Sequence, residues 1–269
     1  MNNIPPLPRV SDEEQKEYEH MKYENSITEL REAMKKARKI VFFGGAGVST
    51  ESGIPDFRSA DGIYNQSYGR IVSPEVIISR SFFDEHPEDF YSFYRDKLLY
   101  LDAKPNISHI RLAEYEKAGK DISIVTQNID GLHQLAGSSK VYELHGSVLR
   151  NYCMKCGKSY TVEQVADPAS PVPRCECGGM IKPDVVLYEE RLDDGVIYAA
   201  VEEISNCDLL IIAGTSLIVY PAAGLVNYFK GDTTALINLS ATDKDDRADI
   251  VIHEKLGTVL SAIKPEEIV

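Results

Sequence analysis

The sequence predicts an α/β protein with a doubly wound parallel sheet and a smaller part inserted into it. Three observations lead to this prediction. Short apolar segments of strand length alternate with segments of helical periodicity along most of the chain. Most of the apolar segments end in glycines or polar side chains, and two intervals, one rich in aromatic residues and one rich in cysteines, interrupt the alternation. Alternating strands and helices are typical of parallel sheets covered by helices.

The N-terminal part is predicted to hold a polar arm and then one helix. Residues 1–22 are polar, with three prolines near the start, and are interpreted as a loose arm. From Ser26 onward the apolar residues recur at helical spacing, and Ser26 with Glu29 fits a capping box. We therefore expect the first helix to begin at Ser26 and to lead directly into the first strand.

Six apolar segments are expected to form the strands of the sheet: residues 40–43, 122–126, 141–144, 209–213, 235–239 and 250–252. Helices are expected at residues 107–119, near 196–205, near 222–229 and at the end of the chain. The aromatic-rich interruption is interpreted as a helical module whose aromatics are mostly core. The predicted division is an arm (1–22), a sheet domain (23–60, 107–148 and 190–269), a helical module (61–106) and a cysteine-bearing insertion (149–189).

Composition excludes several classes of function. The chain has 269 residues and a net charge of −13, which argues against nucleic acid as a direct partner, because phosphate backbones are bound by basic patches. No segment approaches the roughly 18 apolar residues of a membrane span, and no signal-peptide pattern is present. We therefore expect a cytoplasmic protein with no membrane partner. In that reducing compartment, its five cysteines are not expected to form disulfides.

The glycine-rich segment 44–47, after the first predicted strand, is the strongest local signal of a binding site. Glycines let the backbone turn sharply and approach a ligand, and free amides at a helix start attract phosphate. A tight structural turn would look similar, but the loop 53–58 that follows brings an acid, an aromatic ring and a guanidinium together, which suits a lid. Polar residues also follow the later strands. Because parallel strands end at one edge of a sheet, the sequence predicts a dinucleotide site there.

Four of the five cysteines predict a metal site. Cys153-x-x-Cys156 and Cys175-x-Cys177 are separated by 18 residues, close to the spacing of a zinc ribbon, although the second pair is one residue shorter than usual. Four thiolates around one Zn²⁺ would supply the folding energy that so small a segment lacks, and they would leave no open position for catalysis. An iron–sulfur cluster and free thiols are the alternatives. Cys207 has no nearby partner and is interpreted as a buried apolar residue.

Seven motifs together resemble the sirtuin (Sir2) family of NAD-dependent protein deacylases, of the bacterial type. They are G-A-G-V-S-T-E-S-G-I-P-D-F-R, T-Q-N-I-D-G-L-H, L-H-G-S, the four cysteines, K-P-D-V-V, G-T-S-L-I-V-Y-P and I-N-L, over about residues 27–263. The resemblance implies a Rossmann-type NAD-binding domain and a smaller domain made of the zinc-ribbon and helical modules. It also implies NAD as co-substrate, one structural Zn²⁺ per chain, and acyl-lysine proteins or peptides as substrates.

The resemblance also implies roles for individual residues. His145 is the implied general base; Gln127 and Asn128 would hold the nicotinamide ribose and an ordered water, and Asp130 with Ile129 would face the nicotinamide amide. The acyl-lysine oxygen would attack C1′ of the ribose as nicotinamide leaves, and the imidazole would then deprotonate a ribose hydroxyl. The remaining implied cofactor-binding residues are Gly45, Ala46, Gly47, Ser49, Thr50, Asp56, Phe57, Arg58, Gly214, Thr215, Ser216, Asn238, Leu239 and Ser240.

Residues 182–190 would form the edge that pairs with an extended substrate peptide. The implied substrate contacts are Val185, Val186, Tyr188, Glu190 and, in the lysine tunnel with Phe57, Val219. The family usually ends this motif in Phe-Gly-Glu, where this chain has Tyr188-Glu189-Glu190. The replacement of glycine by Glu189 leaves the peptide preference open, whereas pairing through backbone groups should survive.

Two other functions stay open at this point: a protein mono-ADP-ribosyltransferase, and a non-catalytic NAD-sensing zinc-ribbon binding module. Among acyl groups, we expect neutral ones such as acetyl to be preferred over acidic ones such as succinyl. Relatives that accept acidic groups use a Tyr-x-x-Arg pair, and the nearest match here is Tyr94 with Lys97. A lysine lacks the planar fork that binds a carboxylate through two bonds.

Overall fold

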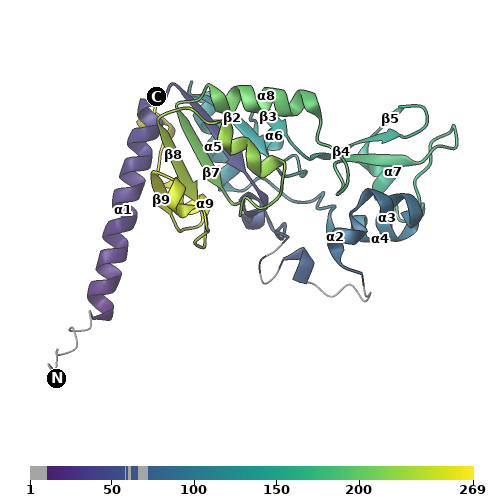
Figure 1. Cartoon of the computed structure of the whole chain (residues 1–269), viewed down its shortest axis with the longest axis horizontal. Coiled ribbons are helices and arrows are strands. Elements are labelled where there is room, and N and C mark those ends of the chain that lie inside the picture. The colour runs from purple at the N-terminus through teal and green to yellow at the C-terminus, as the bar shows by residue number, and fades with distance from the viewer. Residues whose placement is uncertain (1–10, 58, 60–61, 66–71) are drawn as a thin grey trace.

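A parallel sheet forms the body of the molecule (Figure 1), as predicted. The computed structural model describes residues 11–57, 59, 62–65 and 72–269. Within them, six strands pair in the order β3-β2-β1-β7-β8-β9, with every neighbouring pair parallel. The strands are β1 (Lys39–Gly44), β2 (Asp121–Thr126), β3 (Val141–Glu143), β7 (Leu209–Ala213), β8 (Thr233–Ile237) and β9 (Ile250–Ile252). The order runs outward from β1 in both directions, which is the doubly wound arrangement.

Alternating side chains of the central strand enter two different cores. Ile40 and Phe42 pack into one core, and Val41 and Phe43 into the other, because successive residues of a strand point to opposite faces. The first core is closed by α1 (Asp12–Lys36), α5 (Ile107–Lys117) and α9 (Leu256–Ser261), and the second by α8 (Asp194–Ser205) and the 3₁₀ helix η4 (Ala222–Tyr228). The helices therefore cover both faces of the sheet.

The first helix begins earlier than the sequence suggested. Helix α1 starts at Asp12, and its capping box is made by Ser11 and Glu14, so the expectation of a start at Ser26 and of a loose arm up to residue 22 is wrong for residues 12–22. The polar residues of this stretch are good helix formers, and a second capping box further along does not stop a helix that is already running. Only the later half of α1, from Ile27, is buried; the earlier half stands away from the body (Figure 1). Residues 1–10 lie outside the described part.

The other sequence expectations differ from the structure by small shifts. The expected strand 235–239 is β8 at Thr233–Ile237, and the expected helix near residue 222 is a 3₁₀ helix. Short 3₁₀ helices follow the glycine-rich turn as η1 (Ala46–Val48) and η2 (Thr50–Ser52); others are η3 (Ile63–Asn65), η5 (Asp245–Arg247) and η6 (Pro265–Glu267). A short α6 (Leu132–Ala136) follows β2.

The smaller part, on the right of Figure 1, contains both predicted insertions. A three-stranded antiparallel sheet of β5 (Ser159–Tyr160), β4 (Gly146–Cys153) and β6 (Ile181–Val185) carries α7 (Val162–Ala166). Beside it lie α2 (Pro74–Ile77), α3 (Arg80–Glu85) and α4 (Pro87–Lys97). Phe83, Phe90 and Tyr91 are fully buried and share one core with Val165 and Ile181. The aromatics were predicted to be core; that this core is shared by the two insertions was not.

Among the described helices, none is long and apolar enough to span a bilayer.

Candidate functional site

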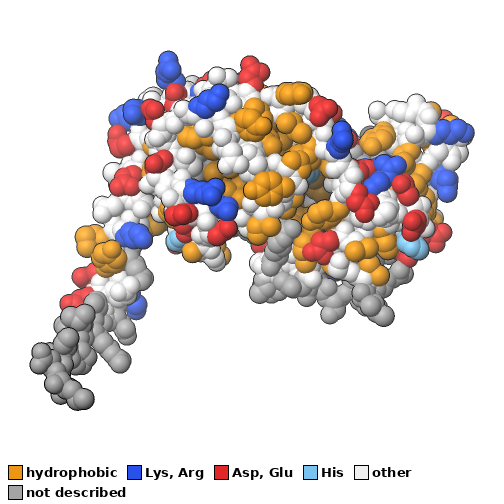
Figure 2. Space-filling view, in the orientation of Figure 1, with side chains coloured by type: hydrophobic (Ala, Val, Ile, Leu, Met, Phe, Trp, Pro, Cys, Tyr) orange, Lys and Arg blue, Asp and Glu red, His pale blue; other side chains and the backbone are white. Residues whose placement is uncertain are grey.

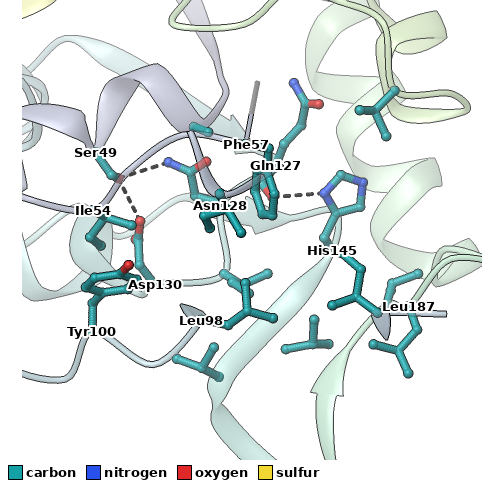
Figure 3. A pocket seen from close by; sticks show the side chains of 18 of the residues that line it. Ser49, Ile54, Phe57, Leu98, Tyr100, Gln127, Asn128, Asp130, His145 and Leu187 are labelled. Carbon is teal, nitrogen blue, oxygen red and sulfur yellow. Dashed lines mark hydrogen bonds between the residues drawn. The ribbon is translucent and has the colours of Figure 1, made fainter. Parts of the chain in front are cut away.

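Polar side chains from separate strand ends meet at the carboxyl edge of the parallel sheet. Ser49 donates to the Oδ2 atom of Asp130 (2.6 Å), and the amide of Asn128 donates to the same serine oxygen (3.0 Å) (Figure 3). Gln127, after β2, donates to the hydroxyl of Thr215, after β7 (3.1 Å). These hydrogen bonds link residues more than 80 positions apart in the chain, as the common edge of the sheet predicted.

A second part of this edge is built from the ends of β7 and β8. The Asn238 side chain accepts from the backbone N–H of Thr215 and donates to its carbonyl (3.0 and 3.1 Å). Gly214 has φ +59°, and a Cβ on it would lie 2.5 Å from the backbone nitrogen of Val48. A Cβ on Gly47 would likewise lie 2.8 Å from the Cα of Gly214. Glycines at these two positions are thus required for the two loops to touch, in addition to any contact with a ligand.

His145 lies between β3 and β4, where the sheet domain passes into the cysteine-bearing insertion. Its Nδ1 lies 2.9 Å from the backbone carbonyl of Gln127, and because a carbonyl only accepts, Nδ1 carries the proton. The unprotonated Nε2 is then free to accept one. Burial lowers the pKa of His145 below its usual value, against a smaller opposing effect of this hydrogen bond. The imidazole is therefore neutral, and able to act as a base, at neutral pH.

A cavity of about 440 Å³ lies in front of these residues, which is the size range of small-molecule sites. Its wall is mainly apolar, and Figure 3 shows Phe57, Asn128, Asp130 and His145 facing it. The residues implied by the resemblance that line it are Ala46, Ser49, Phe57, Gln127, Asn128, Ile129, Asp130, His145, Val185, Val186, Tyr188, Glu190 and Val219. The structure therefore brings the implied catalytic, nicotinamide-side and substrate residues to one cavity.

The other implied cofactor residues lie along the sheet edge outside this cavity. They are Gly45, Gly47, Thr50, Asp56, Gly214, Thr215, Ser216, Asn238, Leu239 and Ser240. Leu239 is 68% exposed, and Asp56 accepts a hydrogen bond from the backbone of Ser59. Arg58, the third implied lid residue, lies outside the described residues.

Several cavity residues were not singled out from the sequence. Tyr100, Leu98 and Leu101 come from the end of the helical module, and Leu135 and Leu149 from the other side. In the sequence such residues look like core residues, because a cavity wall and a core have the same apolar composition. The loop 98–103 could have been suspected only from its lack of helical or strand periodicity.

The helical module does not present Tyr94 to the cavity. Tyr94 is fully buried in the core shared by the two insertions, so the premise that it could meet an acyl carboxylate is wrong. The helical period sets this orientation, since Phe90, four residues earlier, stacks on the same ring. Arg95 donates to backbone carbonyls of Val165 and Ser170. Lys97 does line the cavity, and its ammonium pairs with Asp96 at 3.1 Å.

The end of the predicted substrate edge is held by buried charges. Lys182 is 2% exposed, and its ammonium lies 3.0 Å from the Oε2 atom of Glu190. The other oxygen of Glu190 pairs with Arg80 of α3 at 2.9 Å. Glu190 therefore lines the cavity while its carboxylate ties the substrate edge to the helical module. The sequence shows no signal of this pairing, because the partners are 8 and 110 residues away from Glu190.

The four cysteines of the insertion form one cluster. Their sulfur atoms all lie within 4.8 Å of one another, with Cys153 and Cys177 3.5 Å apart and Cys156 and Cys175 3.6 Å apart. Tetrahedral coordination with Zn–S bonds of about 2.3 Å requires sulfurs about 3.8 Å apart, so the cluster fits Zn²⁺. All four ligands come from the protein, which leaves no open position. Cys207 is buried elsewhere, as expected.

Comparison with known proteins gives a family for this arrangement. The model of the Sir2 family matches residues 45–221, which include the glycine-rich loop, His145 and the four cysteines. The chain belongs to the Sir2 family. An NAD-dependent protein deacetylase of Clostridium acetobutylicum is 56% identical over 240 residues, covering 89% of this chain and 98% of the relative. One of Clostridium perfringens is 55% identical over 242 residues, covering 89% and 99%.

Solved Sir2 structures share the fold as well as the sequence. A structure of Sir2 with p53 peptide and NAD+ is 38% identical, with a TM-score of 0.77 over 87% of this chain and 95% of that chain. A structure of Sir2 bound to acetylated peptide is 36% identical, with a TM-score of 0.76 over 87% of this chain and 95% of that chain. This Sir2 chain therefore has the Rossmann-type domain and smaller domain that its motifs implied.

Proposed function

We propose that this chain is an NAD-dependent protein deacetylase, which removes acetyl groups from lysine side chains and releases nicotinamide and O-acetyl-ADP-ribose. The observation that carries the proposal is His145, held by its Nδ1 with its Nε2 free at a cavity that Asn128 and Val186 also line. The deacetylases at 56% and 55% identity support this activity. The group transfer to ADP-ribose makes the reaction a transferase reaction as well as a deacylation.

NAD supplies the electrophilic ribose carbon and the nicotinamide leaving group. In the proposal, Asp130, whose two oxygens accept from the hydroxyl of Ser49 and the backbone N–H of Leu132, would face the nicotinamide amide. Gln127 and Asn128 would hold the ribose. The Nε2 atom of His145 accepts the proton of a ribose hydroxyl. The hydrogen bond from Nδ1 to Gln127 keeps the ring in the tautomer that this step needs.

The apolar wall of the cavity serves the acyl-lysine. Val186 and Val219, with Phe57, line a tunnel for the aliphatic chain, and the backbone of residues 185–190 pairs with the extended peptide. Such pairing depends on backbone groups, so it tolerates many peptide sequences. The zinc site lies in the insertion that carries this edge, and its proposed role is to fold it. We also propose a cytoplasmic location, a reducing compartment in which the thiols that would hold the zinc stay reduced.

A panel of acylated and unmodified lysine peptides, each with and without NAD, tests the proposal. Nicotinamide release should require both NAD and an acylated peptide, and mass spectrometry should find the acetyl group on ADP-ribose. Attachment of ADP-ribose to protein would instead indicate a mono-ADP-ribosyltransferase. NAD binding with no turnover of any acyl peptide would indicate a binding module.

A further inference from the structure

Glu189 occupies a backbone conformation that favours glycine. Its φ is +74°, in the left-handed region, where a residue with a Cβ is uncommon. The family resemblance implies glycine at this place, which would suit the conformation, whereas this chain places a charged side chain there. Residues held in unfavourable conformations at a site point to a role for their side chains.

Two hydrogen bonds hold the Glu189 carboxylate. One oxygen accepts the backbone N–H of Ser81 (2.9 Å) and the other accepts its hydroxyl (3.0 Å). The backbone beside it is also fixed, since Tyr188 donates to the carbonyl of Ile78 and accepts from the N–H of Arg80. The side chain is therefore placed by helix α3 and the segment before it.

Where residues 188–190 meet helix α3, Glu190 is ion-paired, whereas Glu189 forms no ion pair with a described residue. Arg80 pairs with Asp84 and Glu190, and Lys182 pairs with Glu190, so these four charges cancel. The carboxylate of Glu189 accepts its two hydrogen bonds from neutral groups, the backbone N–H and the hydroxyl of Ser81. Within the described part of the chain, the Glu189 carboxylate is thus held by neutral donors and is not ion-paired.

The carboxylate-bearing side chain of Glu189 is exposed and lines the cavity. The charged side chains among the described lining residues are Lys97, Asp130, Glu189 and Glu190. Lys97 is paired with Asp96, Glu190 is paired twice, and Asp130 is half-buried against Ser49. Glu189 is exposed, next to Tyr188, which also lines the cavity. A peptide whose lysine reaches His145 has to pass this wall with its flanking residues.

We propose that Glu189 determines peptide specificity by favouring substrates with a lysine or arginine close to the acylated lysine, on the side of the helical module. This inference rests on the proposed deacetylase function. A basic side chain of the peptide would meet an exposed carboxylate that is held in place by Ser81 and is not ion-paired within the described residues, while an acidic side chain would be repelled. The preference acts on binding of the peptide and leaves the chemical step unchanged.

The test compares kcat/KM at saturating NAD for acetyl-lysine peptides with neutral flanks and for versions in which one arginine or one glutamate is moved through the flanking positions. At one position, arginine should raise kcat/KM over the neutral peptide by about two- to fivefold, the range of a solvent-exposed ion pair, through KM. High salt should reduce the effect. No preference at any position overturns the proposal.

Two variants separate the charge from the backbone. Glu189→Gln keeps a similar shape and should abolish the preference while deacetylating the neutral peptide normally. Glu189→Gly restores the residue that suits the left-handed conformation, so it should fold and should also lose the preference. As a control, Glu88→Gln removes an exposed charge from α4 at a residue that does not line the cavity. This variant should retain the preference for a basic flanking residue. A preference that survives Glu189→Gln, or is lost in Glu88→Gln, overturns the proposal.

The same assay distinguishes failure of this inference from failure of the proposed function. Turnover of the neutral peptide without any charge preference overturns the role of Glu189 alone. Absence of turnover with every peptide overturns both.

Discussion

At the scale of single residues, His145 is the side chain on which activity should depend most. His145→Ala should lower kcat/KM for deacetylation by at least about a hundredfold, the usual effect of losing a general base, while NAD affinity changes little. Because burial lowers the pKa of His145, the active neutral form persists in mild acid, and the rate should fall only as the pH drops below about 6.5. A pH–rate profile of the wild type measures this fall. If His145→Ala retains more than a tenth of the wild-type activity at neutral pH, the assignment of His145 as general base is wrong.

Two buried histidines under the site should make stability depend on pH. The rings of His133 and His109 are in contact in a tilted arrangement, with centroids 4.6 Å apart, and burial lowers the pKa of His133 to about 3 and that of His109 to about 4. Below pH 6.5 the unfolded chain takes up protons that the folded chain refuses, so stability is full above that pH and falls as the pH decreases toward 4. The loss is about 1.4 kcal/mol per pH unit for each histidine at most.

Urea unfolding of the wild type and His133→Leu at several pH values measures this dependence. The variant removes one titrating group and should show a shallower loss of unfolding free energy in acid. Neither ring nitrogen of His133 has a hydrogen-bond partner among the described residues, so the variant need not be less stable at neutral pH. Parallel curves for the two proteins would show that His133 does not contribute.

Lys97 is the residue that bears on the choice of acyl group. Its ammonium lies at the cavity wall, 3.1 Å from Asp96, which offsets its charge, and Leu98 and Leu101 form the wall beside it. We therefore expect kcat/KM at saturating NAD to be higher for an acetyl peptide than for its succinyl counterpart. Lys97→Arg, which offers a two-bond fork, should raise the succinyl value relative to acetyl. An equal or higher succinyl value in the wild type would contradict this expectation.

At the scale of elements, the zinc cluster should stabilise the insertion that carries the substrate edge. β4 runs from Gly146, next to His145, to Cys153, and it pairs with β6, which ends at Val185 in the cavity wall. Chelation or Cys153→Ala should lower the melting temperature and the activity together, since the metal holds the ends of these strands. Metal analysis should find one zinc per chain. Loss of activity with an unchanged melting temperature would indicate a catalytic metal instead.

Helix α1 shows which part of a helix can be predicted from the spacing of its apolar residues. Ile27, Leu30 and Met34 are buried as their helical spacing predicted. The start of the helix could not be read from the same spacing, because the earlier residues are exposed and their helix depends on propensity and on the cap at Ser11. Amphipathic spacing marks the part of a helix that packs, and says little about the part that does not.

At the scale of the whole molecule, the cavity joins the two domains. Its wall takes Gln127 and Asn128 from the sheet domain, Leu98 from the helical module and Val185 from the zinc-bearing insertion. Arg150 of β4 also bridges the domains, pairing with Glu143 of β3 and with Asp184 of β6 (2.6 and 2.8 Å). The ion pair of Arg150 with Asp184 is about half exposed and therefore weak, whereas the side chain of Glu143 is only 8% exposed. A ligand that fills the cavity would add contacts to both sides.

NAD should therefore raise the melting temperature in a concentration-dependent way. A ligand that binds only the folded chain stabilises it by about 2.7 kcal/mol at a hundred times its dissociation constant. Thermal denaturation over a series of NAD concentrations measures the effect, with adenine alone as a control that lacks the nicotinamide end. A melting temperature that is independent of NAD concentration would show that the folded chain does not bind it.

Taken by itself, the sequence determined the class of the fold and the chemistry of the site. Strands and packed helices have periods of two and 3.6 residues, so the order of the sheet elements could be read locally. The glycine-rich turn, the cysteine spacing and the residues around Asn128 and His145 are short motifs, and each has its partners within a few positions or at the common edge of the sheet. Local patterns of this kind can be recognised in the sequence without knowledge of distant contacts.

Only the tertiary structure decided which side of each element faces the cavity and which charges meet. Tyr94 points into the core shared by the two insertions, and Glu190 forms ion pairs with Lys182 and Arg80. Glu189 adopts a left-handed conformation beside Ser81. The physical reason is the same in each case. These contacts join residues from separate elements, some of them more than a hundred positions apart, and their energies depend on how whole elements pack, which no local period or motif records.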